Sequence, residues 1–328
     1  MDLLKFEKEY WNKGFKYIAG IDEAGRGPLA GPVVAACVIF EKDCIIEGVK
    51  DSKKISEKKR LLLYKEIYQK ALAVEIGIVH NHEIDNINIL QATFLAMNKT
   101  LGRLSVKPEL IFVDGPKSNI KLYPTKHIIN GDNLSQSIAA ASIIAKVTRD
   151  KMMLEFDKVF PEYGFAKHKG YGTKFHIEMI QSIKSSALHR KSFNIVKNNM
   201  PSTRFIRSLN KGFERIGNQI VAMKYIYQGY TIINQSISFD LIDDVLDYYL
   251  FNKYLNRYLF IKIISVVNER KLSLGNCKIK NVDNYIGCID KYVIENNCNK
   301  TYHFNVISIE FLKSKKPIIK TINEKIIN

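Results

Sequence analysis

Cysteine is scarce in this chain of 328 residues, and its pattern excludes two kinds of scaffold. The five cysteines are odd in number and form no Cys-x-x-Cys pair, so we expect neither a disulfide framework nor a zinc site. We interpret them as reduced thiols of a cytoplasmic protein. The chain also lacks a segment that resembles a signal peptide, and no apolar run is long enough to cross a bilayer. We therefore expect no membrane partner.

Acidic side chains are also few, because 33 Asp and Glu stand against 50 Lys and Arg. The resulting net charge of +17 favours a polyanionic partner such as a nucleic acid. An AT-rich genome is the alternative cause, since it enriches Lys, Asn and Ile, and the C-terminal third shows that bias. Charge alone therefore does not identify the partner. A hydrophobic content of 46% is enough for one large domain or two smaller ones.

The most informative segment, Gly20–Pro28, reads Gly-Ile-Asp-Glu-Ala-Gly-Arg-Gly-Pro and follows a short apolar stretch. The adjacent carboxylates of Asp22 and Glu23 are ligands that Mg²⁺ and Mn²⁺ prefer. The glycines allow backbone N–H groups to approach a nucleic-acid strand. Arg26 can bind a phosphate through two parallel hydrogen bonds. The segment therefore predicts a divalent metal held against a phosphodiester.

The position of Asp22 beside Glu23 constrains the local backbone. Successive residues of a regular strand point to opposite faces, and both carboxylates cannot then reach one metal. We therefore expect the strand to end at Asp22, with Glu23 on the following turn. For an isolated Asp-Glu pair, a solvated strand end before a glycine-rich turn is the alternative interpretation.

Further motifs follow in order through the first 200 residues. They are Asp51–Lys54, Asn88–Thr93, Phe112–Gly115, Gly131–Asp132, Ser137–Asp150, Lys169–His176 and His189–Phe193. Together with Gly20–Val34, they resemble ribonuclease HII, the type 2 ribonuclease H, over about residues 17–193. One departure is Gly172, which stands where the family pattern has a proline.

Strands and helices are expected to alternate in this part of the chain, which predicts an α/β fold. The expected strands are Ile18–Asp22, Val33–Phe40, Val74–Val79, Leu110–Asp114 and Lys126–Ile129. The expected helices are Glu57–Ala73, Ile89–Gly102 and Ser135–Phe156. The resemblance implies the ribonuclease H-like fold, a central mixed sheet with helices on both faces.

Matched motif by motif, the resemblance implies that the metal-binding and catalytic acids are Asp22, Glu23, Asp114 and Asp132, holding Mn²⁺ or Mg²⁺. The sequence positions of these acids agree with that assignment, because Asp22 and Asp114 end apolar strands and ligands bind at the carboxyl ends of strands. Taken alone, the alternative interpretation of Asp114 is a turn residue, and that of Asp132 is an N-terminal helix cap or a turn residue. We interpret Asp150 as a helix residue that pairs with Lys146 or Arg149.

The 2′-hydroxyl is the chemical group by which a protein can distinguish RNA from DNA. The backbone of Gly25, Arg26 and Gly27 can hydrogen-bond it, and Tyr171 can stack on the adjoining deoxyribose. In the family, these two elements read the junction between a ribonucleotide and the DNA 3′ to it. The alternative for Tyr171 is a core aromatic.

Other candidate substrate contacts are weaker, because a single lysine is commonly just solvated. Those to phosphates are Lys53, Lys146 and Lys169, and Asn88 is a candidate contact to the other strand. We expect His168, His176 and His189 to be packed or solvent-facing groups and not ligands.

Composition changes near residue 200, where Asn198–Thr203 suits a linker. We expect a catalytic domain at 1–198, a linker at 199–211 and a smaller α/β domain at 212–328. That domain resembles the YraN family (UPF0102), built on a restriction-endonuclease-like core. Lys262 and Ile264 stand where the pattern has Glu and Lys, and of its site only Asp240 remains. We expect a degenerate, non-catalytic domain with an unknown partner; an unrelated α/β appendage is the alternative.

The resemblance implies an endoribonuclease that cuts RNA in RNA–DNA hybrids and at single ribonucleotides embedded in duplex DNA. Two-metal-ion hydrolysis would leave 5′-phosphate and 3′-hydroxyl ends, and we expect a monomer. A type 3 ribonuclease H is one alternative, but it is expected to carry a sizeable N-terminal substrate-binding domain, and only sixteen residues precede Tyr17. A non-enzymatic hybrid-binding protein is another, but it would require a broken carboxylate set.

Overall fold

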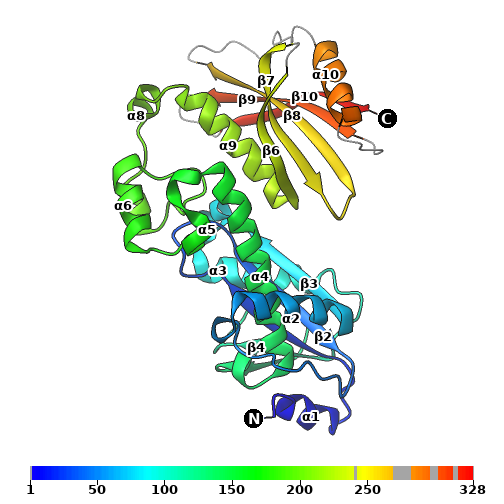
Figure 1. The fold of residues 1–328 in the computed structure, drawn as a ribbon. Helices are drawn as coiled ribbons and strands as arrows, with labels where there is room; N and C mark the ends of the chain where they lie inside the picture. The colour runs from blue at the N-terminus through cyan, green and yellow to red at the C-terminus, as the bar shows by residue number, and fades with distance from the viewer. Residues whose placement is uncertain (1, 240–241, 269–281, 296–301, 313–316, 328) are drawn as a thin grey trace. The chain divides into compact units, whose positions relative to one another are not determined.

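The computed structural model describes residues 2–239, 242–268, 282–295, 302–312 and 317–327 (Figure 1). They form two compact units. The first contains the residues up to 154 together with 164–200. The second contains residues 155–163 and the described residues from 201 onward. Within the second unit, Lys158 Nζ donates to Ile232 O at 2.9 Å, and the rings of Phe156 and Tyr227 lie 5.2 Å apart.

A five-stranded mixed sheet forms the centre of the first unit. Its order is β3-β2-β1-β4-β5, where β1 pairs antiparallel with β2 and parallel with β4. The strands are β1 (Ile18–Ala24), β2 (Val33–Phe40), β3 (Ala71–Val79), β4 (Leu110–Asp114) and β5 (Thr125–Ile128). The expected α/β fold with a mixed sheet is therefore confirmed.

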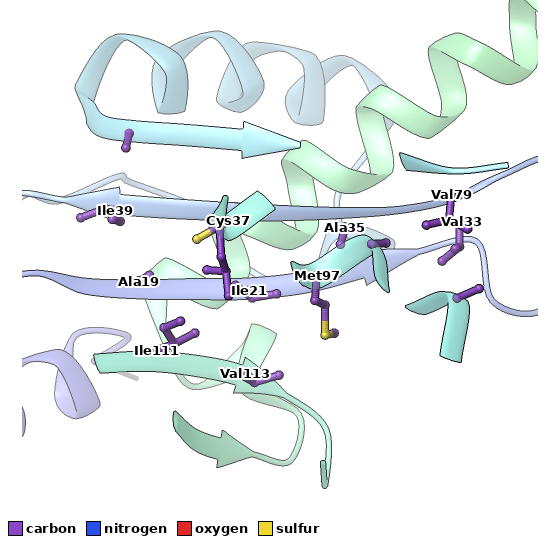
Figure 2. Close-up of a cluster of buried hydrophobic side chains, with 14 of the residues drawn as sticks. Ala19, Ile21, Val33, Ala35, Cys37, Ile39, Val79, Met97, Ile111 and Val113 are labelled. Carbon is purple, nitrogen blue, oxygen red and sulfur yellow. The ribbon is translucent and has the colours of Figure 1, made fainter. Parts of the chain in front are cut away.

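Helices cover both faces of this sheet. On one face, a buried cluster that includes Ala19 and Ile21 packs against Met97 of α3 (Asn81–Leu101), as Figure 2 shows. On the other face, Ile18 packs with Trp11 of α1 (Lys5–Trp11). Gly20 shares that face with Ile18, because side chains alternate along a strand. A Cβ there would lie 2.1 Å from the Ser137 carbonyl carbon of α4 (Gln136–Val159), and only glycine allows this approach.

The remaining helices of the first unit are short, apart from α2 (Glu57–Lys70) and α6 (Lys174–Ile183). The others are α5 (Phe165–His168), α7 (Asn194–Lys197) and the 3-10 turns Ser52–Lys54 and Gly131–Asn133. The expected strand at Lys126–Ile129 and helix at Ser135–Phe156 are present with ends shifted by one to three residues.

Three expected boundaries are wrong. β1 does not end at Asp22, because Glu23 and Ala24 continue the antiparallel pairing with β2. α2 ends at Lys70, three residues before the expected end, and β3 begins at Ala71, three residues before the expected Val74, because Ala71 already pairs with Phe40 of β2. By contrast, the expected helix start at Ile89 is present, because Asn88 has non-helical backbone and separates two helical segments within α3, Asn81–Leu101. The first of these segments, which follows His80, was not expected.

The second unit contains another five-stranded sheet, of order β10-β9-β8-β7-β6. β8 and β9 are parallel and the other neighbours are antiparallel. Its elements are α8 (Thr203–Ser208), α9 (Gly212–Tyr227), β6 (Tyr230–Phe239), β7 (Ile242–Asn252), β8 (Arg257–Asn268), α10 (Val282–Glu295), β9 (Tyr302–Leu312) and β10 (Ile318–Ile327). A smaller C-terminal α/β unit is thus confirmed, whereas its resemblance to the YraN family stays a prediction. Asp240 lies outside the described residues.

Two further expectations concern cysteine and membranes. Cys37, Cys44 and Cys288 are free thiols, whereas Cys277 and Cys298 lie outside the described residues. Among the helices that the structure describes, none combines the length and the apolar character needed to span a bilayer.

Candidate active site

The four predicted acids line one cleft of about 620 Å³ in the first unit. Asp22 and Glu23 come from β1, Asp114 ends β4, and Asp132 lies in the 3-10 turn before α4. β1 and β4 are parallel neighbours, and their carboxyl ends therefore meet at one edge of the sheet. The sheet order alone brings acids from distant parts of the sequence together.

Asp22 and Glu23 both line this cleft although the strand runs through both residues. The Glu23 N–H donates to Asp22 Oδ1 at 2.6 Å, which turns the Asp22 carboxylate toward Glu23. Arg26 Nη1 lies 3.2 Å from Glu23 Oε1 in the turn that follows. The strand therefore does not have to end at Asp22 for both residues to line the cleft. That both carboxylates bind one metal stays a prediction.

Burial and like charge act together on these acids. The pKa of Asp22 lies well above its usual value, first because the carboxyl is buried and then because Glu23 and Asp114 are close. Burial also raises the pKa of Glu23, against the opposite effect of Arg26. The pKa of Asp132 is raised to about 6 by burial and by the carboxylates of Asp51 and Asp114.

The chemistry of these acids fits a divalent cation. Buried carboxylates that repel one another are costly in the absence of a compensating positive charge. Their hard oxygen atoms are the donors that Mg²⁺ and Mn²⁺ prefer. The donor set is therefore suited to these ions.

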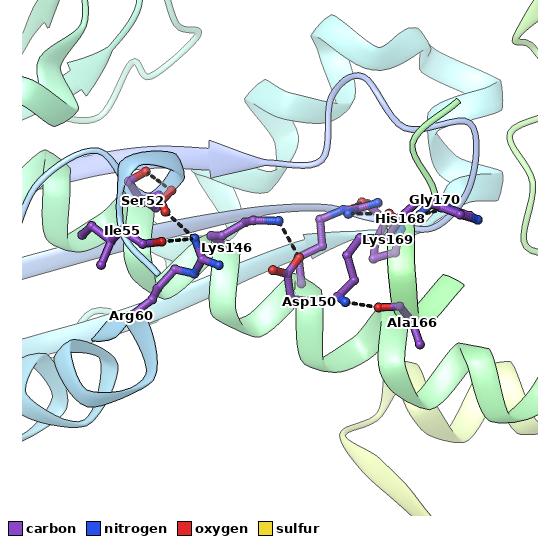
Figure 3. Close-up of polar contacts among 12 residues, drawn as sticks. Ser52, Ile55, Arg60, Lys146, Asp150, Ala166, His168, Lys169 and Gly170 are labelled. Carbon is purple, nitrogen blue, oxygen red and sulfur yellow. Dashed lines mark hydrogen bonds and ion pairs between the residues drawn. The ribbon is translucent and has the colours of Figure 1, made fainter. Parts of the chain in front are cut away.

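Six of the eight predicted substrate residues line the same cleft: Gly25, Arg26, Gly27, Lys53, Lys146 and Tyr171. Lys146 Nζ also binds Asp150 Oδ1 at 2.7 Å (Figure 3), which confirms the predicted pairing of Asp150. Tyr171 is 41% exposed, which argues against a core aromatic.

The structure does not bring Asn88 or Lys169 into the lining of this cleft. Asn88 interrupts α3 with a φ of 65°, and its Oδ1 accepts from the N–H groups of Leu90 and Gln91. Lys169 Nζ donates to the Ala166 carbonyl (Figure 3). Both side chains therefore form hydrogen bonds with nearby backbone groups, and a substrate role for them stays a prediction.

Two serines that the sequence did not single out also line the cleft. Ser52 Oγ and Ser142 Oγ are 3.0 Å apart, and a hydrogen bond from Ser142 partly offsets the raised pKa of Asp22. Both lie inside motifs already recognised, at 51–54 and 137–150. Membership of those motifs was the available signal, but a serine by itself carries too little chemistry to be selected.

Five of the seven histidines lie in two groups, one of which contains His168, stacked on His176 with ring centroids 4.4 Å apart. His176 and His189 are fully buried with their Nε2 atoms 3.0 Å apart, which confirms them as packed groups. His80, His82 and Glu83 offer ligand atoms within 4.8 Å of one another. Glu83 already accepts from the His80 N–H and from Lys99 Nζ, at 2.9 and 3.2 Å. We interpret this second group as the capped start of α3.

Comparison with known proteins agrees with the motifs. A family model described as Ribonuclease HII matches residues 19–196. Ribonuclease HII of Clostridioides difficile (strain 630) is 56% identical over 191 residues, 57% of this chain and 74% of that protein. Ribonuclease HII of Acholeplasma laidlawii (strain PG-8A) is 52% identical over 193 residues, 59% of this chain and 95% of that protein.

Among solved structures, the ribonuclease H2 from Pyrococcus horikoshii OT3 is similar with a TM-score of 0.48 and 25% identity. The match covers 58% of this chain and 98% of that one. The family model itself spans more than half of the chain and includes every acid of the cleft. This chain belongs to the ribonuclease HII family and is an endoribonuclease.

Proposed function

We propose that this enzyme hydrolyses the RNA strand of RNA–DNA hybrids and also cuts at single ribonucleotides embedded in duplex DNA. The products are 5′-phosphate and 3′-hydroxyl ends. The observation that supports it is one cleft lined by four carboxylates, the Gly25–Gly27 backbone and the Tyr171 ring. The carboxylates serve the hydrolysis, and the other two elements serve recognition of the sugar.

Asp22, Glu23, Asp114 and Asp132 are the proposed holders of two divalent ions, Mg²⁺ or Mn²⁺. When bound, such a pair supplies an activated water and stabilises the leaving oxygen. The protein contributes a positioned donor set, because three of these acids lie on strands of the sheet and the fourth, Asp132, lies in the turn that Asp114 binds. The like charges that raise the pKa values of Asp22 and Asp132 are the charges that the ions neutralise.

Recognition of the substrate falls to groups around the acids. Arg26, Lys53 and Lys146 bring positive charge to the cleft and are proposed phosphate contacts. The backbone of Gly25–Gly27 donates to the 2′-hydroxyl, and the exposed Tyr171 ring stacks on the deoxyribose that follows. A second 2′-hydroxyl at that position would meet the ring, which favours a ribonucleotide followed by DNA.

The C-terminal unit is proposed to be non-catalytic and to raise affinity for duplex through its charge. Residues 201–328 carry 19 basic and 11 acidic side chains, a net charge of +8. The proposed division is a catalytic domain at 1–198, a linker at 199–211 and this domain at 212–328. We keep a monomeric, cytoplasmic enzyme as part of the same proposal.

One assay tests the proposed activity. Duplex DNA with a single ribonucleotide and a long RNA–DNA hybrid are each incubated with the full chain in Mg²⁺ and in Mn²⁺. Cleavage of both, with 3′-hydroxyl and 5′-phosphate ends, is expected. Cleavage of the hybrid alone would contradict the proposed single-ribonucleotide activity. Cleavage without a divalent metal would contradict the proposed two-metal mechanism.

A further inference from the structure

Two arginines of the first unit are almost completely buried and bind backbone carbonyls of one loop. Arg190, with no exposed surface, donates from Nη2 to Gly25 O at 2.5 Å and from Nη1 to Arg26 O at 2.8 Å. Arg149, 1% exposed, donates from Nε to Pro32 O at 2.9 Å and from Nη2 to Ala30 O at 3.1 Å. The loop that connects β1 to β2 is therefore held by two guanidinium groups.

The bonds of Arg190 set the direction of the loop's N–H groups. A trans peptide places its C=O and N–H on opposite sides. Since the carbonyls of Gly25 and Arg26 face Arg190, the N–H groups of Arg26 and Gly27 face away from it. Residues 25–27 line the cleft, and these two donors are thereby available to a substrate hydroxyl.

Arg149 also reaches the segment that carries Tyr171. Its Nη1 donates to Lys169 O at 2.9 Å, and its guanidinium carbon lies 6.0 Å from the centre of the Tyr171 ring. The Leu29 N–H donates to Gly170 O at 2.8 Å in the same region. One side chain thus joins the loop arm, residues 25–32, to the tyrosine arm, residues 169–171.

The two arms approach too closely for any residue but glycine at position 170. Gly170 has a φ of 86°, and a Cβ there would lie 2.7 Å from Ala30 O. A charged side chain buried at this junction is costly unless its donors are satisfied, and an apolar side chain would fill the space more simply. Unlike an apolar group, the guanidinium orients its binding partners, because its N–H donors point in fixed directions.

We propose that Arg149 is a positioning residue for the junction between RNA and DNA. It fixes the distance between the N–H donors of the loop arm and the ring of Tyr171. A lone ribonucleotide followed by DNA engages both arms at once. Arg190, whose hydrogen bonds described above all go to the loop arm, supports the donors without setting that distance. The proposal rests on the proposed function.

The test compares kcat and KM of Arg149→Lys and Arg190→Lys on a lone ribonucleotide in duplex DNA and on a long hybrid. Arg149→Lys keeps the charge but loses the fork, and it should lower kcat/KM on the lone ribonucleotide by about 100-fold, the loss typical of a misplacement of about 1 Å. On the hybrid, which depends less on Tyr171, the loss should be at least several-fold smaller. Arg190→Lys should lower kcat/KM by the same factor on both substrates.

Gly170→Ala provides a second variant that retains both arginines. It separates the arms directly and should change the substrate ratio in the same direction as Arg149→Lys. Met97→Ala is the matched control, because Met97 of α3 is a member of the buried cluster on one face of the sheet, and its truncation should lower the melting temperature without altering the ratio of kcat/KM on the two substrates.

The outcomes separate the two proposals. Arg149 would be only structural if Arg149→Lys and Gly170→Ala left the ratio of kcat/KM on the two substrates unchanged and lowered the melting temperature as Met97→Ala does. If the wild-type enzyme fails to cut at a lone ribonucleotide, the single-ribonucleotide part of the proposed function is overturned, and this inference with it. If Arg149→Lys does not fold, Gly170→Ala alone decides between the two roles.

Discussion

The Gly131 N–H donates a hydrogen bond to Asp114 Oδ1 at 2.7 Å. This contact ties the end of β4 to the turn that carries Asp132, although 17 residues separate the two partners. Asn133 Nδ2 in turn donates to Asp132 Oδ1 at 2.7 Å. Two carboxylates of the cleft are thus oriented before any ligand arrives, and each keeps an oxygen that these bonds do not use.

Replacing Asp22 or Asp114 by Asn should abolish metal-dependent cleavage while binding of an RNA–DNA hybrid persists. Each substitution removes one negative charge from the cleft with little change in shape, and the amide oxygen in Asp114→Asn can still accept from the Gly131 N–H. Cleavage rates in Mg²⁺ and Mn²⁺, together with hybrid affinity in EDTA, check this prediction. Wild-type turnover by either variant would contradict the assignment of these acids.

Tyr171→Ala should reduce cleavage at a lone ribonucleotide by about 10-fold, which corresponds to the lower part of the roughly 1–3 kcal/mol that stacking of a base on an aromatic ring is worth. A long hybrid should be affected less, because stacking on a deoxyribose is specific to the junction. Tyr171→Phe retains the ring and serves as the control. Equal losses on the two substrates would indicate that Tyr171 acts structurally.

Asp132 should destabilise the metal-free protein at neutral pH. Its folded pKa of about 6 lies above the ordinary 3.8, so the folded state binds the proton more tightly. The destabilisation is absent below pH 3.8, develops as the pH rises toward 6, and persists above it. Asp132→Asn should therefore raise the free energy of unfolding by about 2 kcal/mol at about pH 7 and by almost nothing at about pH 4.

Urea unfolding in EDTA at the two pH values measures this effect. Added Mg²⁺ or Mn²⁺ should then stabilise the wild type more than the Asn variant, because the ion neutralises the charge that the variant lacks. An Asn variant that is less stable than the wild type at neutral pH in EDTA would show that Asp132 contributes structurally.

His176 should make the protein sensitive to mild acid. Burial lowers its pKa from 6.5 to about 4, against the bond that its Nδ1–H donates to Tyr171 O. Its contribution is complete above pH 6.5 and is lost as the pH falls toward 4. His176→Asn keeps a donor but does not titrate. The wild type should lose about 2 kcal/mol more than the variant between about pH 7 and about pH 5. Parallel losses in urea unfolding would contradict this.

A chain that ends after Met200 should keep its cleavage activity, and residues 201–328 alone should have none. The truncated chain should melt at a lower temperature, because Phe156 and Lys158 lose Tyr227 and the Ile232 carbonyl. The full chain should show the steeper fall of log K with log salt, since its second unit neutralises further phosphates. Identical slopes would leave the second unit without a nucleic-acid role.

Short local sequence patterns determined several of the strands and most of the residues of the candidate site. The strands Val33–Phe40 and Leu110–Asp114 were predicted to the residue, because uninterrupted apolar runs of that length form buried strands. The family motifs identified the four acids of the cleft and most of the residues around it. Such signals are contained in a few neighbouring residues and survive without knowledge of the fold.

Tertiary structure decided the features that depend on distant partners. Glu23 belongs to β1 because Ala35 of the next strand pairs with it. The burial of Arg149 and Arg190 follows from carbonyls that lie more than 100 residues earlier in the chain. The Lys169 carbonyl accepts from Arg149, which lies 20 residues earlier in the chain. A hydrogen bond of this kind has no local signature, because its geometry exists only after the strands and helices have packed.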